Sequence, residues 1–247
     1  MRTPHPAPLS PAAREAFRAQ QVAAIPAWYC PWAHLLGPSL FGLVVIAAAV
    51  ALLRQLRPWE LLTVPVVFVL SNAAEWRIHR DWLHRRTRPV QLLYDRHTPI
   101  HHRIYITQDM AIRSRKEYRL VLLPAYAILL ILLAVAPLTA LLWVGLGARN
   151  VALLFLATSL SYALSYEWLH LCYHLPADSF WGRRRIIQVL RRHHAIHHGP
   201  ERMQRWNFNV TVPLWDLVRH TLYRGPLPAS REAGQHVPLD PARAGGP

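Results

Sequence analysis

The chain has 247 residues, of which 53% are hydrophobic, and 28 Lys and Arg against 13 Asp and Glu give it a formal charge of +15. A soluble domain would have to carry long apolar segments and this basic excess on one surface, whereas a membrane protein places them in lipid and in loops respectively. The apolar segments also argue against a nucleic-acid-binding protein, which the charge alone would suggest. Two cysteines, Cys30 and Cys172, are too few for a disulfide framework or a cysteine-rich zinc site.

Residues 1–27 are rich in Pro and Ala and predict a flexible or surface-lying cytoplasmic segment. Residues 28–224 form one predicted transmembrane domain, because they hold stretches that approach the ~20 apolar residues needed to cross a bilayer as a helix. These stretches lie at about 35–53, 61–78, 120–136 and 151–173. Residues 225–247 are again rich in Pro, Gly and Ala and predict a disordered tail. The sequence therefore predicts an all-α, integral-membrane bundle of about four transmembrane helices.

The third apolar stretch is followed by Pro137, which we expect to end the helix because proline cannot donate a backbone hydrogen bond. Residues 138–146 are too short to cross the membrane alone, so we expect a lumenal or re-entrant continuation there. The fourth stretch carries small residues suited to close helix packing, namely Ala157, Ser159, Ser161, Ala163 and Ser165.

Basic residues are concentrated between positions 77 and 119 and again between 183 and 205. The other loops carry only Arg54 and Arg57 on one side and Arg149 on the other. Because cytoplasmic loops carry an excess of Lys and Arg, the two basic regions are predicted to face the cytoplasm. Both chain ends then lie on that side, which agrees with an even number of spans.

Eleven of the fifteen histidines fall in four short blocks on the predicted cytoplasmic side. The blocks are His79 and His84; His97, His101 and His102; His170 and His174; and His193, His194, His197 and His198. A single pair of this kind is more often a coincidence than a metal site. Four blocks on one side of a membrane indicate a shared metal cluster, because buried polar groups are costly unless something binds them.

Helical spacing predicts which of these side chains share a face, since residues three or four apart are neighbours. His170 and His174 share one face, and His194, His197 and His198 share another. His97 and His101 pair in the same way if their segment is helical, although Pro99 lies between them. His79 and His84 are five residues apart, about 140° around a helix, so we expect them to reach different metals or to lie where the helix ends.

The number of histidines helps to choose between one structural metal ion and two reactive ones. Imidazole ligands suit zinc, iron, copper or nickel. A structural zinc site is closed by four ligands, whereas about ten histidines are enough for two metals with open positions. This excess favours two irons that handle dioxygen, held in a cytoplasmic helical cap.

From about residue 70 to 224, the pattern resembles the fatty acid hydroxylase/sterol desaturase superfamily of membrane enzymes. The ligand set implied by the resemblance is His79, His84, His97, His101, His102, His170, His174, His194, His197 and His198. The segments Asn207-Phe208-Asn209-Val210-Thr211 and Leu214-Trp215-Asp216 are similar to the region after the last histidine block in lipid hydroxylases. The first block, from Glu75 to His84, looks especially like that of fatty acid and sphingolipid 2-hydroxylases. Asn209 departs from the family, because many members have glycine there, and this could alter the turn.

The resemblance implies a dioxygen-dependent di-iron lipid hydroxylase that inserts a hydroxyl group into an unactivated C–H bond of a fatty acyl chain or another lipid. Its cofactors would be two iron ions, which zinc can replace in purified samples, with dioxygen as co-substrate. The lipid would enter from the bilayer. Because no cytochrome b5-like domain is seen in the sequence, we expect a separate electron donor of the cytochrome b5 or ferredoxin type on the basic cytoplasmic face. No catalytic residue beyond the metal ligands is predicted.

Further residues near the blocks are candidates for supporting roles. Glu75 and Glu167 are expected to orient ligand histidines by accepting their second ring N–H. His193 and Asn209 are candidates for contacts with the ligands, and Asp216 either makes such a contact or caps a helix. The aromatic residues near the blocks could line the lipid path or could be ordinary core and interface anchors; they are Trp76, Trp82, Trp168 and Phe208.

Two other functions remain open on sequence grounds. A desaturase or methyl oxidase acting on sterols or other lipids would use the same scaffold, and a carotenoid hydroxylase would as well. A non-oxidative metal-binding or transport protein is disfavoured, because a translocation path needs polar residues along the spans. Apart from Glu75 and Glu167 beside the histidine blocks, Asn72 and a few Ser and Thr residues are the polar groups visible there.

Overall fold

A computed structural model describes residues 8–225, and in this part of the chain the secondary structure is helical, with no β-strand. The predicted tail at 225–247 lies outside the described residues except for Gly225. The long elements are α1 (Pro11–Ala23), α2 (Pro31–Ala51), α3 (Thr63–Ile78), α7 (Ala127–Ala140), α8 (Arg149–His174) and α9 (Arg185–His197). The short ones are η1 (Pro58–Leu62), η2 (His79–Leu83), α4 (Gln91–Arg96), η3 (His97–His101), α5 (His102–Ile104), η4 (Arg115–Glu117), α6 (Tyr118–Val121), η5 (Leu141–Gly145) and α10 (Leu214–Val218).

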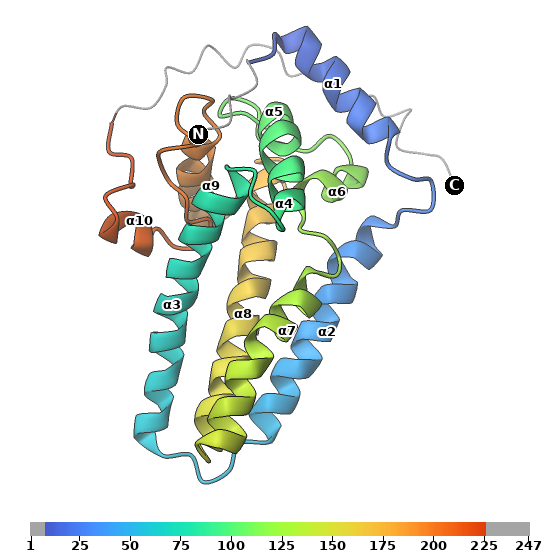
Figure 1. Ribbon diagram of the computed structural model, residues 1–247. Helices are drawn as coiled ribbons and strands as arrows, with labels where there is room; N and C mark the ends of the chain where they lie inside the picture. The colour runs from blue at the N-terminus through green and yellow to red at the C-terminus, as the bar shows by residue number, and fades with distance from the viewer. Residues whose placement is uncertain (1–7, 226–247) are drawn as a thin grey trace.

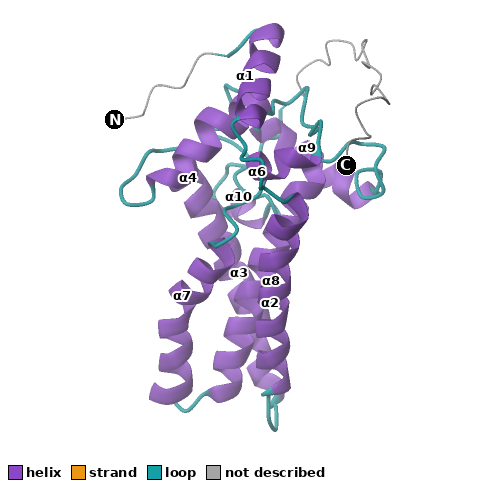
Figure 2. Cartoon of the chain, turned by 90° about the vertical axis from the view of Figure 1, so that its right-hand side faces the viewer, coloured by secondary structure: helices purple, strands orange, loops and turns teal. Residues whose placement is uncertain are grey.

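Helices α2, α3, α7 and α8 run side by side as a bundle, and α8 contacts the other three (Figure 1). The short helices α4, α5 and α6, together with α9 and α10, gather at one end of this bundle, and α1 lies on the outer side of that end (Figures 1 and 2). We call this end the cap. Because α8 and α9 also contact each other, the cap is packed directly onto the central helix of the bundle.

Three segments are long and apolar enough to cross a membrane, namely Pro31–Ala51, Pro58–Leu83 and Ala127–Gly145. Their apolar side chains largely point outward, as Val66, Leu70 and Leu133 show with exposed fractions of 55%, 60% and 58%. An apolar outer band of this kind is stable in lipid and not in water. The protein is therefore a membrane protein. The fourth predicted span, α8, is a 26-residue helix but is not among the three by hydropathy.

The third span differs from the sequence prediction at both ends. The helix begins at Ala127 rather than near Leu120, because the backbone turns extended at Leu122. It then continues through Pro137 to Ala140 and on to Gly145 as a π-helical turn, so residues 138–146 are the end of the same span and not a separate element. Proline removes only one backbone donor, and a membrane helix tolerates it because local π adjustments satisfy the freed groups.

The N-terminal segment contains helix α1, which starts at Pro11 after Ser10 caps it by accepting a hydrogen bond from the Ala13 N–H. Proline at the first position and serine before it are typical of helix starts. The helix is attached to the cap through Arg18, which is 4% exposed, donates to the carbonyl oxygen of Ala111 and lies 3.5 Å from a carboxylate oxygen of Glu117. Residues 11–23 thus have a defined place on the surface of the cap.

Candidate metal centre

The ten predicted ligand histidines come together where the bundle meets the cap. They form two groups of five, and within each group one ring nitrogen from every residue lies within 4.8 Å of the others. We call them group A, formed by His79, His84, His97, His102 and His197, and group B, formed by His101, His170, His174, His194 and His198. All ten are buried, and rings of the two groups are also in contact, with His102 and His198 stacked at 4.2 Å between centroids.

Two π-helical turns decide how the histidines are divided. His79 opens the turn η2 and His84 follows its end, and the two rings stack with centroids 5.1 Å apart. A π turn bonds residues five apart, so it brings His79 and His84 to the same side. Of the two alternatives predicted for this pair, the structure shows the second: both residues lie where the helix ends, and both belong to group A. His97 and His101 occupy the second π turn, η3, and fall into different groups.

Backbone carbonyls fix the orientation of half of these rings. The hydrogen bonds run from Nδ1 of His79 to Phe208 O (2.5 Å), His101 to Leu120 O (3.0 Å), His174 to Met110 O (2.7 Å), His197 to Trp206 O (2.8 Å) and His198 to Tyr105 O (2.7 Å). A carbonyl oxygen can only accept, so the proton of each neutral imidazole lies on Nδ1 and its Nε2 carries a lone pair. The same holds for His84, whose Nδ1 lies 3.1 Å from the Thr98 hydroxyl oxygen, because that hydroxyl donates to Leu83 O.

The resulting pattern of lone pairs fits divalent metal ions. The Nε2 atoms of His84 and His197 are 2.9 Å apart, although neither carries a proton to share. Two imidazole nitrogens each about 2.1 Å from one ion, and at right angles to each other, lie about 3.0 Å apart. In group B, the Nε2 atoms of His101, His170 and His174 are buried and lack hydrogen-bond partners. Buried lone pairs that converge without donors are costly unless a cation binds them.

Burial also keeps the histidines of the cap neutral. Removal from water lowers the pKa of His101 to about 3, and it lowers the pKa values of His97, His194 and His198 well below that of free imidazole. Metal ligands must be deprotonated. These side chains therefore hold metal-binding lone pairs at neutral pH without first having to lose a proton.

Asp216 holds the loop that presents the carbonyl group to His79. Its carboxylate is fully buried and accepts hydrogen bonds from the backbone N–H groups of Phe208 (2.9 Å) and Asn209 (2.8 Å). The amide oxygen of the Asn209 side chain accepts a hydrogen bond from Asp216 N–H, and its amide nitrogen donates to the carbonyl oxygen of Asn72 on α3. Asn209 does not have a positive φ, so the turn does not require glycine at this position. His193 lies outside both groups, with Nε2 3.1 Å from Asn209 O and 3.4 Å from Asp216.

The two glutamates also hold backbone segments. Glu75 is buried and accepts from the hydroxyl groups of Thr211 (2.6 Å) and Tyr162 and from the N–H groups of Val210 and Thr211. Glu167 accepts from Leu123 N at 2.9 Å, just after the segment whose Leu120 carbonyl group holds His101. We expected these carboxylates to accept ring N–H groups directly. Their hydrogen bonds instead hold the loops whose carbonyl groups do so.

Sequence reasoning missed the residues that complete these networks. Tyr162 lies on α8, two turns before the third histidine block, and its hydroxyl accepts a hydrogen bond from the Asn72 amide. Thr98 lies next to His97 but supports His84. No spacing rule identifies either residue, because their partners are distant in the chain or belong to another histidine block.

The four aromatic candidates have different positions. Phe208 is 1% exposed and packs on group A, with its ring centroid 5.7 Å from His197, and Trp76 packs on Phe208 at 5.8 Å. Trp168 donates to the Ser39 hydroxyl on α2 at 3.0 Å, and Trp82 is 38% exposed. Phe208 thus packs against one side of group A, whereas Trp168 connects α8 to α2.

Comparison with known proteins adds one match. Residues 64–221, more than half of the chain, match the family model described as "Fatty acid hydroxylase". No curated protein and no solved structure matches the chain. The matched residues include all ten histidines of the two groups as well as Asp216 and the loop before it.

Proposed function

The chain belongs to the fatty acid hydroxylase family, part of the fatty acid hydroxylase/sterol desaturase superfamily, and on this premise we propose that it is a dioxygen-dependent di-iron lipid hydroxylase. The reaction would insert a hydroxyl group into an unactivated C–H bond of a fatty acyl chain or another lipid. The observation that carries the proposal is the convergence of two groups of five buried histidines in a membrane-embedded bundle. Imidazole ligands are compatible with iron, and two adjacent groups supply a place for two ions.

The protein's own groups have three tasks in this proposal. Groups A and B would each hold one iron, and iron with dioxygen supplies the oxidising chemistry when bound. The carbonyl groups of Phe208 and Leu120 keep the rings of His79 and His101 turned toward their groups. Phe208 and Trp76 cover group A and exclude water from that side.

We further infer that α8 crosses the membrane together with the three apolar spans, because it contacts all three of them and buries Asn150, Ser159 and Tyr162. The exposed Ser165 donates its hydroxyl group to the carbonyl oxygen of Ser161 on the same helix. Four spans would bring the cap, the histidine groups and both chain ends to the cytoplasmic side, where the basic loops belong. A separate electron-transfer protein of the cytochrome b5 or ferredoxin type would then dock on the basic cap. Exposed residues available for this contact include Arg183, Arg184, Arg185 and Arg192.

A desaturase or methyl oxidase is the second candidate, since the same ligand set would serve it. Lipid analysis separates the two in cells that express the wild-type protein, the variant His197→Ala and the control His220→Asn. His220 is exposed, lies outside both groups and has a φ of 55°, which asparagine tolerates. Iron content is measured on each purified protein.

A lipid that is heavier by one oxygen atom with the wild type and the control, but not with His197→Ala, would establish hydroxylation and identify the substrate. A lipid that is lighter by two hydrogen atoms would establish a desaturase instead. Folded wild-type protein that holds no iron when iron is plentiful would rule out both oxidative functions and favour a metal-binding role.

A further inference from the structure

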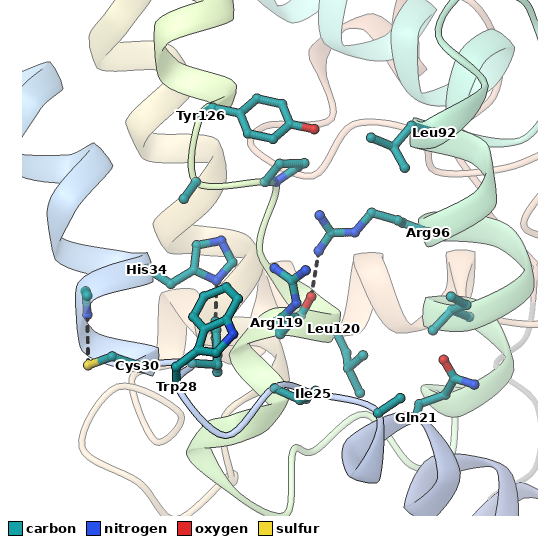
Figure 3. A pocket seen from close by; sticks show the side chains of 16 residues that line it. Gln21, Ile25, Trp28, Cys30, His34, Leu92, Arg96, Arg119, Leu120 and Tyr126 are labelled. Carbon is teal, nitrogen blue, oxygen red and sulfur yellow. Dashed lines mark hydrogen bonds between the residues drawn. The ribbon is translucent and has the colours of Figure 1, made fainter.

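A cavity of about 670 Å³ opens beside the cap, between the α1–α2 connection, α4 and the segment that joins α6 to α7 (Figure 3). This volume lies in the range of small-molecule sites in proteins. Its walls are mostly apolar and include Ile25, Leu92, Ile100 and Leu120. Two arginines, Arg96 and Arg119, also face the cavity.

Both arginines make their direct contacts with uncharged groups. Arg96 donates to the backbone carbonyl oxygen of Arg119 at 2.7 Å, and the Arg119 guanidinium lies 5.8 Å from the centre of the Tyr29 ring. Within residues 8–225, no ion pair involves either side chain. Glu167 interacts electrostatically with Arg96 but does not form an ion pair with it, and one oxygen of Glu167 accepts a hydrogen bond from the N–H of Leu123. Two neighbouring guanidinium groups in an apolar wall repel each other, and a bound anion would offset this repulsion. The planar N–H donors of arginine match carboxylate and phosphate.

Exposed aromatic residues that line the cavity indicate that it opens at the level of the membrane surface. Trp28, 81% exposed, lies three residues before α2 begins at Pro31, and Tyr126, 50% exposed, directly precedes α7. Both helices are membrane spans, and Trp and Tyr gather where a bilayer meets water. A ligand at this mouth therefore comes from the headgroup region of the membrane, with the apolar walls available for its chain.

The same cavity adjoins the histidine groups. A second, smaller cavity is lined by His97 of group A and by His101 and His170 of group B. The two cavities share Arg96, Leu120 and Pro124 as walls. Arg96 thus lies where the larger cavity meets the smaller cavity beside the histidines, and Arg119 lines the larger cavity.

We propose that Arg96 and Arg119 bind the anionic headgroup, carboxylate or phosphate, of the lipid on which the enzyme acts, with the lipid chain along the apolar walls of this cavity. That the bound lipid is the substrate rests on the proposed function, but the binding itself does not depend on iron. The site would select acidic lipids over neutral lipids of equal chain length.

The test is equilibrium binding to the full chain in neutral-lipid nanodiscs, with binding to empty nanodiscs subtracted. The ligands share one chain length and differ in headgroup: hexadecanoate, hexadecyl phosphate and hexadecanol, with inorganic phosphate as the chain-free probe. An acidic headgroup should increase affinity about ten-fold or more over hexadecanol, since hydrogen bonds to charged groups are about twice as strong as neutral ones. Inorganic phosphate should bind much more weakly than hexadecyl phosphate.

The variants test whether the preference for acidic lipids depends on Arg119. Arg119→Gln should reduce the preference for acidic lipids about ten-fold, and Arg119→Lys should retain part of it. The matched control is Lys116→Gln, which removes one exposed positive charge nearby but does not line the cavity and should leave the preference unchanged.

Equal affinity for hexadecanoate, hexadecyl phosphate and hexadecanol in the wild type would overturn the proposal, as would an equal loss in Arg119→Gln and Lys116→Gln. The wild-type comparison holds even if a variant fails to fold. Iron content and product analysis are separate readouts, so a protein that binds acidic lipids but holds no iron would contradict the hydroxylase function and not this site.

Discussion

The replacement Asp216→Asn tests whether a buried carboxylate controls metal binding from outside the histidine groups. It keeps the size of the side chain but removes its charge and turns one acceptor oxygen into a donor amide. The carboxylate accepts from Phe208 N and Asn209 N, and Phe208 in turn offers its carbonyl oxygen to His79. The amide oxygen can accept from one of the two backbone N–H groups, but the amide NH2 group then faces the other N–H, and two donors cannot form a hydrogen bond. The loop that aligns His79 should therefore loosen.

The size of the effect follows from the bonds that are lost. A hydrogen bond to a charged group contributes about 1.5–3 kcal/mol, and an unsatisfied buried N–H adds a similar cost. A loss of about 2 kcal/mol at His79 corresponds to roughly a 30-fold weaker metal affinity, within the 10- to 100-fold typical of residues that support metal ligands. Because the loop supports group A and not group B, the variant should lose one ion more easily than the other.

The assay is iron content as a function of chelator concentration, measured on purified wild-type protein and on the variants. The wild type should release its two ions together or with similar resistance, whereas Asp216→Asn should release one at a clearly lower chelator concentration. The control is Asp95→Asn, whose carboxylate is 39% exposed and forms a surface ion pair with Arg86. Surface pairs contribute about 0–1 kcal/mol, so this variant should behave like the wild type. If Asp216→Asn retained both ions with wild-type resistance, the loop would not control the site.

Three further predictions concern the same region. Thr98→Val removes the group that holds His84 Nδ1 and should weaken metal binding about ten-fold or more, by the same chelator assay; wild-type retention would contradict the role given to Thr98. Metal-free protein should lose stability as pH falls below about 6.5. Burial lowers the pKa of His101 to about 3, so between these pH values His101 is protonated in the unfolded chain and neutral in the folded protein. The free energy of unfolding should then fall by up to about 1.4 kcal/mol per pH unit for each such histidine, and a Tm that is constant from pH 7 to 5 would refute this. Trp168→Phe should lower stability by about 1 kcal/mol through loss of its bond to Ser39, without changing the products; altered products would give Trp168 a substrate role.

The sequence by itself determined the class of the protein and the inventory of its site. Apolar stretches of membrane length predicted the spans, and three of them are present with shifted ends. The four histidine blocks, their location on one side of the spans and their number predicted a two-metal centre, and the structure brings all ten predicted ligands into two groups. These features are readable because each depends on composition or on local spacing, which the chain carries wherever it folds.

The tertiary structure decided how those residues are divided and held. Spacing on an ideal helix separated His79 from His84, but a π turn joins them. The groups that hold the rings are mostly main-chain carbonyls from distant segments, such as Tyr105 for His198. Every residue carries the same carbonyl group, so no side-chain pattern marks the ones that are used. Glu75 and Asp216 could be noticed as carboxylates near the site, but the bonds that define their roles form only when the loop at residues 208–211 folds against α3.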